Sequence, residues 1–225
     1  MSQTVFNQFL TDNETTQALS AVMAKLEGYQ QQLKGICPPK EGLQASYDET
    51  VAGFAEYRGG KLFFPYLSSG LGKGPLVELA DGSVKYDFII GIGVHIMGHS
   101  HPGLIEACLK ASLADTVMQG NLQQNTDSYE FTDMLLKAAN TNGAGFDHCF
   151  LTSSGAMAGE NAVKIAFQKK APAQRLLAFH HCFMGRTLAM ASATDKAAYR
   201  VGLPKTLEVD YVPFFDVERP EESTK

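Results

Sequence analysis

The first clear pattern of hydrophobic and polar positions lies between residues 15 and 34. Apolar side chains recur there at the spacing of one helical face, at Leu19, Val22, Met23, Leu26 and Leu33. This spacing predicts an amphipathic helix, which Gly35 ends and Pro38 and Pro39 prevent from continuing. The alternation over residues 41–61 is weak, and this stretch is compatible with either a helix or a loop.

A different pattern follows in LVELADGSVKYDF, residues 76–88. Two runs of alternating apolar and polar residues flank Asp81 and Gly82, and both of these turn residues tolerate a positive φ. The stretch therefore predicts a β-hairpin. GLGKG at 70–74 and GIGVH at 91–95 match neither the P-loop nor the dinucleotide fingerprint, and we interpret both as turns.

Helices and short apolar runs alternate in the second half of the chain. Pro102 is expected to open a helix of about a dozen residues, because its missing N–H does no harm in the first turn. A second helix is expected at about 127–139, where Asp127 and Glu130 favour its positive end. After it, the pattern predicts three strands, HCFLTS, RLLAFHH and LEVDYVPF. They are separated by two predicted helices, GAMAGENAVKIAFQKK and GRTLAMASA. Such alternation predicts parallel βαβ units, so the fold class expected is α/β from about residue 105, preceded by a smaller α+β segment.

Small residues are concentrated at one strand-to-helix junction, TSSGAMAGENAVK. Ser154 is a suitable N-cap, and the N–H groups of Gly155, Ala156 and Met157 would be the unpaired donors at the helix start. Together with the helix dipole they predict a site that a phosphate group can approach closely. The small residues would serve equally well to pack the helix on a sheet through one face, which carries Ala158, Ala162, Ile165 and Ala166.

Composition and charge limit the classes of protein to which the chain can belong. The chain has 225 residues, 44% hydrophobic and 19% charged, which is enough to bury a substantial core. A net charge of -5 with scattered Lys and Arg argues against nucleic acid or an anionic membrane as the main partner. We expect no secretory signal and no membrane span. The four cysteines, which suit reduced thiols in a cytoplasmic protein, are Cys37, Cys108, Cys149 and Cys182.

Three histidines could in principle bind a metal ion, namely His95, His99 and His101. Gly98 interrupts their spacing, Pro102 ends it, and no suitably placed Cys or carboxylate follows. We therefore expect no metal site and interpret the three side chains as ordinary hydrogen-bonded histidines.

Three blocks of the sequence, in the same order, resemble segments of the class III aminotransferases of the ornithine and acetylornithine type, which depend on pyridoxal phosphate. The blocks are DFIIGIGVHIMGHSHP, SSGAMAGENAVKIA and CFMGRTLAMASAT, and the similarity covers about residues 62–215. The resemblance implies a fold-type I α/β architecture. Residues 1–60 would form an N-terminal arm and helix, 61–104 a small α+β segment with the hairpin, and 105–225 the first part of the large domain that binds pyridoxal phosphate.

The resemblance also implies roles for single residues. The residues that would bind the cofactor are Ser154, Gly155, Ala156 and Phe183. Phe183 would stack on the pyridine ring, Arg186 would bind a carboxylate of the substrate, and Ile92 would line the substrate pocket. Taken singly, each residue would be better explained without a ligand, Phe183 as a core residue and Arg186 as a surface or helix-end charge, and the phosphate motif beside them favours the functional interpretation.

The sequence departs from the family pattern at two positions. Met157 stands where Glu is usual and Met184 where His is usual, which would alter the hydrogen bonds around the cofactor. The lysine that forms the Schiff base is expected beyond residue 225, so no catalytic residue is assigned. Lys164 is expected at the protein surface, and Lys196 and Lys205 match no motif.

For the complete enzyme, the resemblance implies transfer of an amino group from an ornithine-like or other ω-amino acid to an oxo acid. The cofactor would be pyridoxal 5'-phosphate, the protein a homodimer, and this chain alone inactive. Two alternatives remain open: a non-catalytic half-domain or pseudoenzyme that binds pyridoxal phosphate or another phosphometabolite, and an aminomutase or decarboxylase of the same fold.

Overall fold

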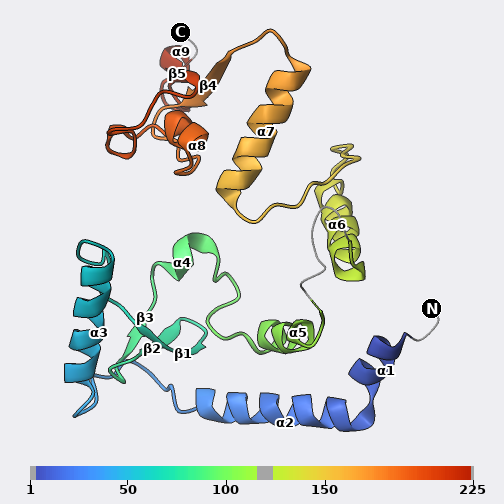
Figure 1. The fold of residues 1–225 in the computed structure, drawn as a ribbon, viewed down its shortest axis with the longest axis vertical. Coiled ribbons are helices and arrows are strands. Elements are labelled where there is room, and N and C mark those ends of the chain that lie inside the picture. Colours follow the sequence, from blue (N-terminus) through green and yellow to red (C-terminus); the bar gives the residue numbers. More distant parts are fainter. Residues whose placement is uncertain (1–3, 116–123, 224–225) are drawn as a thin grey trace. The chain divides into compact units, whose positions relative to one another are not determined.

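The chain forms two compact units in the computed structural model, which describes residues 4–115 and 124–223. The first unit is Met1–Gln123 and the second is Gln124–Lys225. Figure 1 labels their helices and strands. In the first unit the elements follow in the order α1 (Val5–Thr11), α2 (Asn13–Gln30), α3 (Gln44–Tyr57), β1 (Ser68–Lys73), β2 (Leu76–Leu79), β3 (Val84–Tyr86), α4 (Ile90–Gly93) and α5 (Pro102–Ser112). In the second unit they follow in the order α6 (Thr126–Ala139), α7 (Gly155–Lys169), β4 (Arg175–Phe179), α8 (Leu188–Ala193), the 3-10 turn η1 (Ala197–Tyr199), β5 (Glu208–Val212) and α9 (Pro220–Ser223).

The predicted helix at 15–34 is present as α2, with both ends displaced toward the N-terminus. Asp12 caps it, because its carboxylate accepts hydrogen bonds from the N–H groups of Glu14 and Thr15. After Gln30 the chain tightens into a turn instead of continuing the helix. The stretch at 41–61, for which the sequence allowed helix or loop, contains helix α3.

The hairpin predicted at 76–88 is confirmed. Strands β2 and β3 pair antiparallel, with Leu76 opposite Tyr86, and the N–H of Gly82 donates to the carbonyl of Leu79 across the turn. The interpretation of 70–74 as a turn is wrong, since most of this stretch lies in β1, which pairs antiparallel with β2 and completes the sheet in the order β1-β2-β3. Gly72 in this strand allows His99 to pack directly on it, since a Cβ atom there would lie 2.4 Å from the Cβ of His99. The buried core beside the sheet consists of Leu33, Leu76 and Val84.

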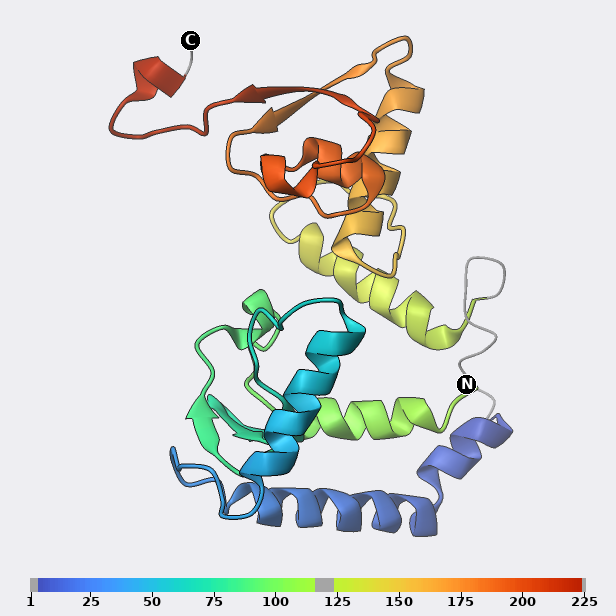
Figure 2. The same cartoon turned by 60° about the vertical axis from the view of Figure 1, so that its left-hand side comes forward.

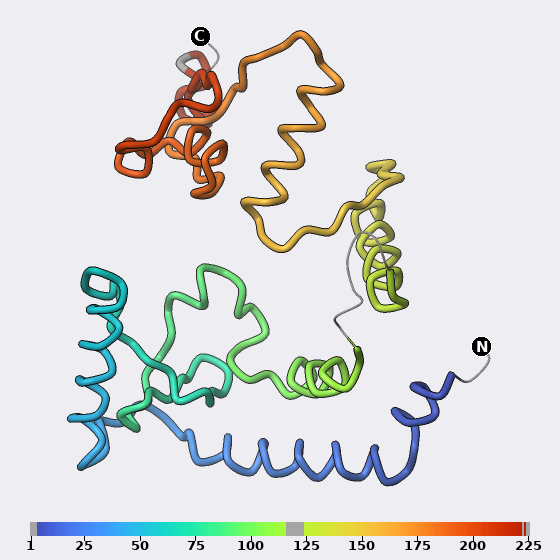
Figure 3. The backbone as a smooth tube through the Cα atoms, in the orientation of Figure 1, coloured from blue at the N-terminus to red at the C-terminus, as the bar shows by residue number. Residues whose placement is uncertain are grey.

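A long connection leads from β3 through α4 and back to β1, as the tube in Figure 3 shows. The N–H of His99 donates to the carbonyl of Gly74, and the two residues form an isolated antiparallel bridge. The buried amide of Gln30 then donates to the carbonyls of both Gly72 and Ser100, at 2.8 Å each. The Gln30 side chain therefore joins helix α2 to the edge strand and to the connection, and a backbone hydrogen bond joins the connection to the residue after β1.

Two helices begin where the sequence indicated. Pro102 is the first residue of α5, as predicted. The helix expected at 127–139 is α6, which is capped by Asn125 and has Asp127 in its first turn. In its capping box, the Asn125 side chain accepts from the N–H of Ser128, and the Ser128 hydroxyl accepts from the N–H of Asn125.

The second unit contains the expected α/β pattern. Strands β4 and β5 pair parallel, from Arg175 opposite Glu208 to Phe179 opposite Val212. Helix α8 packs against both α7 and β5, as Figure 2 shows. The predicted parallel arrangement of RLLAFHH and LEVDYVPF is therefore confirmed, with α7 before β4 and α8 between the two strands in sequence.

The strand predicted for HCFLTS is not present. Residues 148–153 have no strand conformation, and their backbone makes no ladder hydrogen bond to any other part of the described chain. A strand requires a paired neighbour, and within the described part of the chain β4 and β5 pair only with each other. The apolar run correctly marks the approach to α7 but adopts an extended, unpaired conformation.

Two findings concern the expected environment of the chain. Within the described residues, no helix is both long enough and apolar enough to cross a lipid bilayer. The cysteines Cys37, Cys108, Cys149 and Cys182 are all free thiols.

Candidate active site

A groove of about 680 Å³ in the second unit brings together the first turn of α7 and the loop before α8. Its lining residues are Gly155, Ala156, Gly159, Phe183, Met184, Gly185, Arg186 and Thr187. Gly155, Ala156, Phe183 and Arg186 are among them, so four of the residues singled out by sequence meet in one place. Ser154 directly precedes the groove as the N-cap of α7.

The N-terminus of α7 leaves two backbone donors free. The hydroxyl of Ser154 accepts a hydrogen bond from the N–H of Met157 at 3.2 Å, so the expectation that Met157 offers an unpaired donor is wrong. The N–H groups of Gly155 and Ala156 have no acceptor among the described residues. Because α7 has 15 residues with aligned peptide dipoles, these two donors carry a partial positive charge into the groove.

Glycines allow the loop and α8 to approach α7 closely. A Cβ atom on Gly185 would lie 2.8 Å from the Cβ of Ala156, and one on Gly159 would lie 2.6 Å from the Sδ of Met190, which is fully buried. Gly185 also has a φ of 132°, which favours glycine. The alternative, that one face of α7 packs on a sheet, is not found within the described residues of the second unit. All four residues of that face are exposed, namely Ala158, Ala162, Ile165 and Ala166. The reason is that Gly185 and Met190 pack against a different side of the helix.

Phe183 and Arg186 both present their side chains to solvent. The ring of Phe183 is 63% exposed and meets the ring of Tyr199 edge to face, with centroids 6.1 Å apart. Arg186 is exposed and makes no ion pair with any described residue. The interpretation of Phe183 as a core residue is therefore wrong, and an open aromatic face lies beside an unpaired guanidinium.

Ile92 lies in the first unit, in the distorted turn α4. Its side chain is 91% exposed, and its φ of 58° is rare for a β-branched residue. The turn is held at its start by Asp87, whose carboxylate accepts hydrogen bonds from the N–H groups of Ile89 and Ile90 at 2.7 and 3.0 Å. The stretch interpreted as a turn at 91–95 thus forms a strained turn whose apolar side chain projects outward.

The second oxygen of the Asp87 carboxylate contacts the Nε2 of His99 at 2.7 Å. Burial raises the pKa of Asp87, but the hydrogen bonds from His99 and from the N–H groups of Ile89 and Ile90 outweigh it, and the pKa is lowered below its ordinary value. Of the three histidines expected to be hydrogen-bonded, His99 is therefore confirmed. The Nδ1 of His101, in contrast, is buried without a partner among the described residues.

The lysines of the second unit that the structure describes lie outside the groove lining. Lys164 is exposed on α7. The ammonium of Lys196 lies 4.8 Å from the centroid of the Tyr199 ring, and Lys205 pairs with Glu208 at 2.6 Å. None of the three is placed among the residues that form the groove.

Sequence reasoning missed two residues, Glu160 and Thr194, which do not line the groove but contact residues that do. The hydroxyl of Thr187 donates to the carboxylate of Glu160 on α7, and the hydroxyl of Thr194 contacts the backbone of the loop. A signal for Thr194 existed, because it is the last residue of the block CFMGRTLAMASAT. No local pattern indicated that Glu160 would reach Thr187, since this contact joins α7 to the residue before α8.

The sequence matches the model of the family "Aminotransferase class-III" over residues 65–225. The chain belongs to this family. Similar class-III relatives include an acetylornithine aminotransferase of Methanocaldococcus jannaschii, 34% identical over 158 residues that make up 68% of this chain and 38% of the relative. A second acetylornithine aminotransferase, of Methanosarcina acetivorans, is 29% identical over 78% of this chain and 43% of its own length. The chain thus spans about two fifths of the length of these curated relatives.

Solved structures agree on the fold. An ornithine aminotransferase of Toxoplasma gondii ME49 superposes with a TM-score of 0.61 at 23% identity, over 86% of this chain and 44% of the other. A Bacillus anthracis aminotransferase superposes with a TM-score of 0.62 at 23% identity, over 78% of this chain and 40% of the other. The chain therefore has the α/β fold of the fold-type I class over the part that these structures share with it.

The cofactor of class-III aminotransferases is pyridoxal 5'-phosphate. The residues of the groove fit this cofactor in two respects. Free N–H groups at a helix N-terminus suit a phosphate, and the exposed face of Phe183 suits an aromatic ring.

Proposed function

We propose that this chain provides the cofactor-binding part of an aminotransferase that depends on pyridoxal phosphate and moves an amino group from an amino acid to an oxo acid. The observation that carries the proposal is the groove of the second unit, where the free N–H groups of Gly155 and Ala156 open beside the exposed ring of Phe183. A phosphate donor set and an aromatic face in one groove match the two ends of a single cofactor.

Each residue has a distinct part in binding. Gly155 and Ala156 donate backbone hydrogen bonds to the phosphate, and the dipole of α7 strengthens them. Ser154 fixes the first turn by accepting from Met157, which keeps the two free donors aligned. Phe183 covers one face of the pyridine ring. When bound, the cofactor supplies an electron sink for the amino acid.

Arg186 is proposed to hold a carboxylate of the substrate. Its guanidinium lines the same groove as Phe183 and is unpaired within the described residues, so its planar donors are available for a bidentate contact. This suits an amino donor that carries a carboxylate and a distal amine, such as an ornithine-like or other ω-amino acid. Ile92, projecting from α4, is proposed to add an apolar lining to the substrate pocket.

We further propose that residues 105–225 are the first part of the large domain, preceded by the arm and helix of 1–60 and the small α+β segment of 61–104. The lysine that binds the cofactor's aldehyde is proposed to lie beyond residue 225. Support comes from the groove, which is lined by no lysine of the described residues, and from the relatives, of which the chain matches about two fifths.

Titration with pyridoxal phosphate tests the proposal. The purified chain is mixed with the cofactor, its visible absorption is recorded, and the sample is reduced with borohydride to map any labelled lysine. We expect saturable binding that inorganic phosphate competes away, with no single lysine labelled. A demonstrably folded chain that does not bind the cofactor would contradict the assignment.

A matched pair of charge variants locates the site. Gly155→Asp places a carboxylate among the phosphate donors and is expected to weaken binding at least tenfold, the factor that about 1.4 kcal/mol of repulsion produces. Ala162→Asp introduces the same charge on an exposed position of the same helix and should leave binding nearly unchanged. Equal effects of the two variants would argue against a phosphate site at the start of α7.

The assembly and location of the protein are part of the proposal. A homodimer would cover apolar side chains that each unit leaves open, such as Phe63 and Phe88, which are 92% and 90% exposed. Sedimentation as a clean monomer at high concentration would count against it. The free state of all four cysteines supports a cytoplasmic location.

A further inference from the structure

The loop that carries Phe183 and Arg186 is held by one buried hydroxyl. Thr194, which is 1% exposed, accepts hydrogen bonds from the N–H groups of Met184 at 2.9 Å and Gly185 at 3.2 Å. The same hydroxyl donates to the carbonyl of Gly185 at 3.0 Å. One side chain therefore satisfies three backbone groups of the residues between Phe183 and Arg186.

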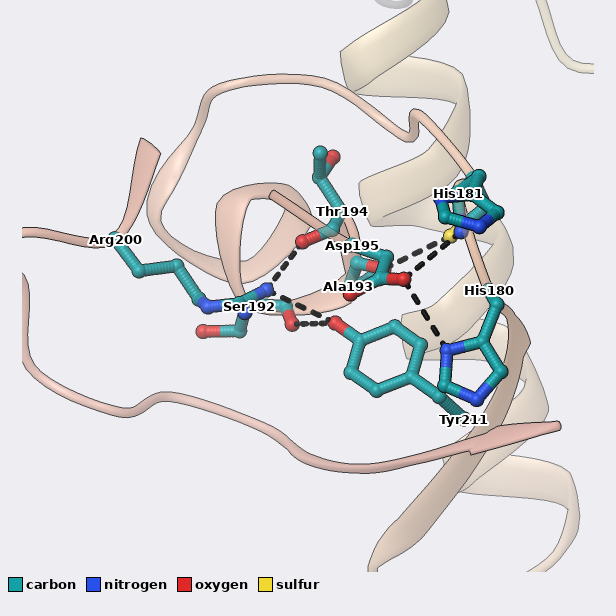
Figure 4. Close-up of polar contacts among 9 residues, drawn as sticks. His180, His181, Ser192, Ala193, Thr194, Asp195, Arg200 and Tyr211 are labelled. Carbon is teal, nitrogen blue, oxygen red and sulfur yellow. Dashed lines mark hydrogen bonds and ion pairs between the residues drawn. The ribbon is translucent and has the colours of Figure 1, made fainter. Parts of the chain in front are cut away.

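Thr194 is itself fastened to the sheet. The guanidinium of Arg200 donates both to the carbonyl of Thr194 and to the hydroxyl of Tyr211, the latter at 3.1 Å. The Tyr211 hydroxyl donates in turn to the carbonyl of Ser192 at 2.9 Å. Figure 4 shows this chain of contacts running from Thr194 through Arg200 to Tyr211, which belongs to β5. These hydrogen bonds fix the backbone position of Thr194, and with it the position of its hydroxyl.

The neighbouring residue holds the other end of the same loop. The carboxylate of Asp195 accepts from the N–H of His181 at 2.8 Å and contacts the Nδ1 of His180 at 3.3 Å, as Figure 4 shows. The N–H of Asp195 donates to the carbonyl of Cys182 at 3.0 Å. Residues 180–185 are therefore tied to Thr194 and Asp195 on both sides of Phe183.

We propose that Thr194 is a positioning residue, which sets the ring of Phe183 and the guanidinium of Arg186 at the groove without contacting a ligand itself. Thr194 is absent from the groove lining, whereas Met184 and Gly185, whose backbone it holds, belong to it. This inference rests on the proposed function for the identity of the ligand. The phosphate donors at Gly155 and Ala156 are set by α7 and its cap, so Thr194 acts on the ring-binding part of the groove.

The chemistry of the side chain explains why a threonine is needed. A hydroxyl can accept two hydrogen bonds and donate one, which is the number of contacts found here. Valine has the same shape but would leave two N–H groups and one carbonyl unpaired in a buried position. Serine keeps the hydroxyl and loses only a methyl group, so it serves as the rescuing variant.

The experiment compares Thr194→Val, Thr194→Ser and a matched control, Thr206→Val. The hydroxyl of Thr206 bonds the carbonyl of Leu188, and the residue does not line the groove. For each chain, we measure the dissociation constants of pyridoxal phosphate and of inorganic phosphate. Thr194→Val is expected to weaken the cofactor about fivefold to tenfold, the scale of a stacked aromatic contact, and phosphate less than twofold. Thr194→Ser and Thr206→Val should stay near the wild-type values.

Two binding results would overturn the proposal. One is equal cofactor affinity in a folded Thr194→Val chain, and the other is an equal loss for cofactor and phosphate, which indicates a general structural defect. Amide hydrogen exchange of the ligand-free chain provides a second readout. Exchange at Met184 and Gly185 should be faster in Thr194→Val and restored in Thr194→Ser, and unchanged exchange would also overturn it. If the wild-type chain binds no cofactor, the proposed function fails, and the exchange result alone decides the role of Thr194.

Discussion

Two glycine-rich regions, one in each unit, use missing side chains for different purposes. In the first unit, Gly72 lies against His99, where a Cβ atom would come within 2.4 Å of the His99 Cβ, and a Cβ on Gly98 would come within 2.7 Å of the Cα of Gly74. The polar backbone groups brought together there are paired, and the buried Gln30 amide binds two of the carbonyls. This region is therefore a closed structural contact.

The region at the start of α7 is open. Gly185 and Gly159 also permit close packing, against Ala156 and Met190. The backbone N–H groups at the start of the helix, however, remain without acceptors among the described residues, and space remains around Gly155, where nothing lies within 4 Å of a Cβ position. Glycines permit close packing in both regions. Unpaired donors beside free space distinguish the candidate ligand site from the structural contact.

The largest expected change in stability comes from overpacking the contact between Gly185 and Ala156 in the second unit. Gly185→Ala adds a Cβ atom 2.8 Å from that of Ala156 at a φ of 132°. Backbone strain and overpacking together are expected to lower the free energy of unfolding by about 3 kcal/mol. Urea denaturation followed by circular dichroism measures this.

Gly155→Ala is the matched control for that variant, because its Cβ would enter open space. Alanine has the higher helix propensity, so stability should stay within about 1 kcal/mol of the wild type or rise. Similar losses from both variants would remove the distinction between a packed and an open glycine at this helix.

A smaller loss of stability is expected when the Gln30 hydrogen bonds in the glycine-rich region of the first unit are removed. Gln30→Met removes the two hydrogen bonds to the carbonyls of Gly72 and Ser100 while nearly preserving volume. One buried and one partly buried carbonyl would lose this donor, and the free energy of unfolding should fall by about 2 kcal/mol. The same measurement on Gln32→Met, at an exposed position of the same segment, should show little change. Cofactor affinity should not change in either, and a weakened affinity in Gln30→Met would contradict a purely structural role.

Removing the cap of α7 is expected to cost less. Ser154→Ala eliminates the acceptor for the Met157 N–H and should lower stability by about 1 kcal/mol. It should also weaken binding of pyridoxal phosphate, because the free donors next to it become less well fixed. Ser153→Ala, which precedes the cap, is the control, and identical behaviour of the two serine variants would show that the cap has no part in the site.

The smallest expected change is a pH dependence in the first unit. Because the pKa of Asp87 is lowered in the folded chain, its contribution is complete above the ordinary value of 3.8 and is lost as pH falls through the lower folded pKa. The stability difference between the wild type and Asp87→Asn should therefore be constant near neutral pH and shrink below about pH 4. Thermal unfolding from pH 7 to pH 3 measures it, and a difference that grows on acidification would contradict the assignment.

Signals confined to neighbouring residues predicted their elements well. Asp81 and Gly82 indicated the hairpin, Pro102 the start of α5, and Ser154 the start of α7, because a turn or a cap depends on groups only a few residues apart. Elements that depend on a distant partner were harder to predict. GLGKG lies mostly in a strand because β2 pairs with it, and HCFLTS is not a strand because no described strand lies beside it.

The same division holds for the candidate site. The sequence alone determined that a capped helix would start at Gly155 with free N–H groups, since helix geometry leaves these donors unpaired wherever the helix begins. Only the tertiary structure decided that Phe183 and Arg186 lie in the same groove, and that Thr194 holds the loop between them. Close packing of Gly185 on Ala156 produces this arrangement, and such a contact depends on the shapes of two distant segments, which no local periodicity records.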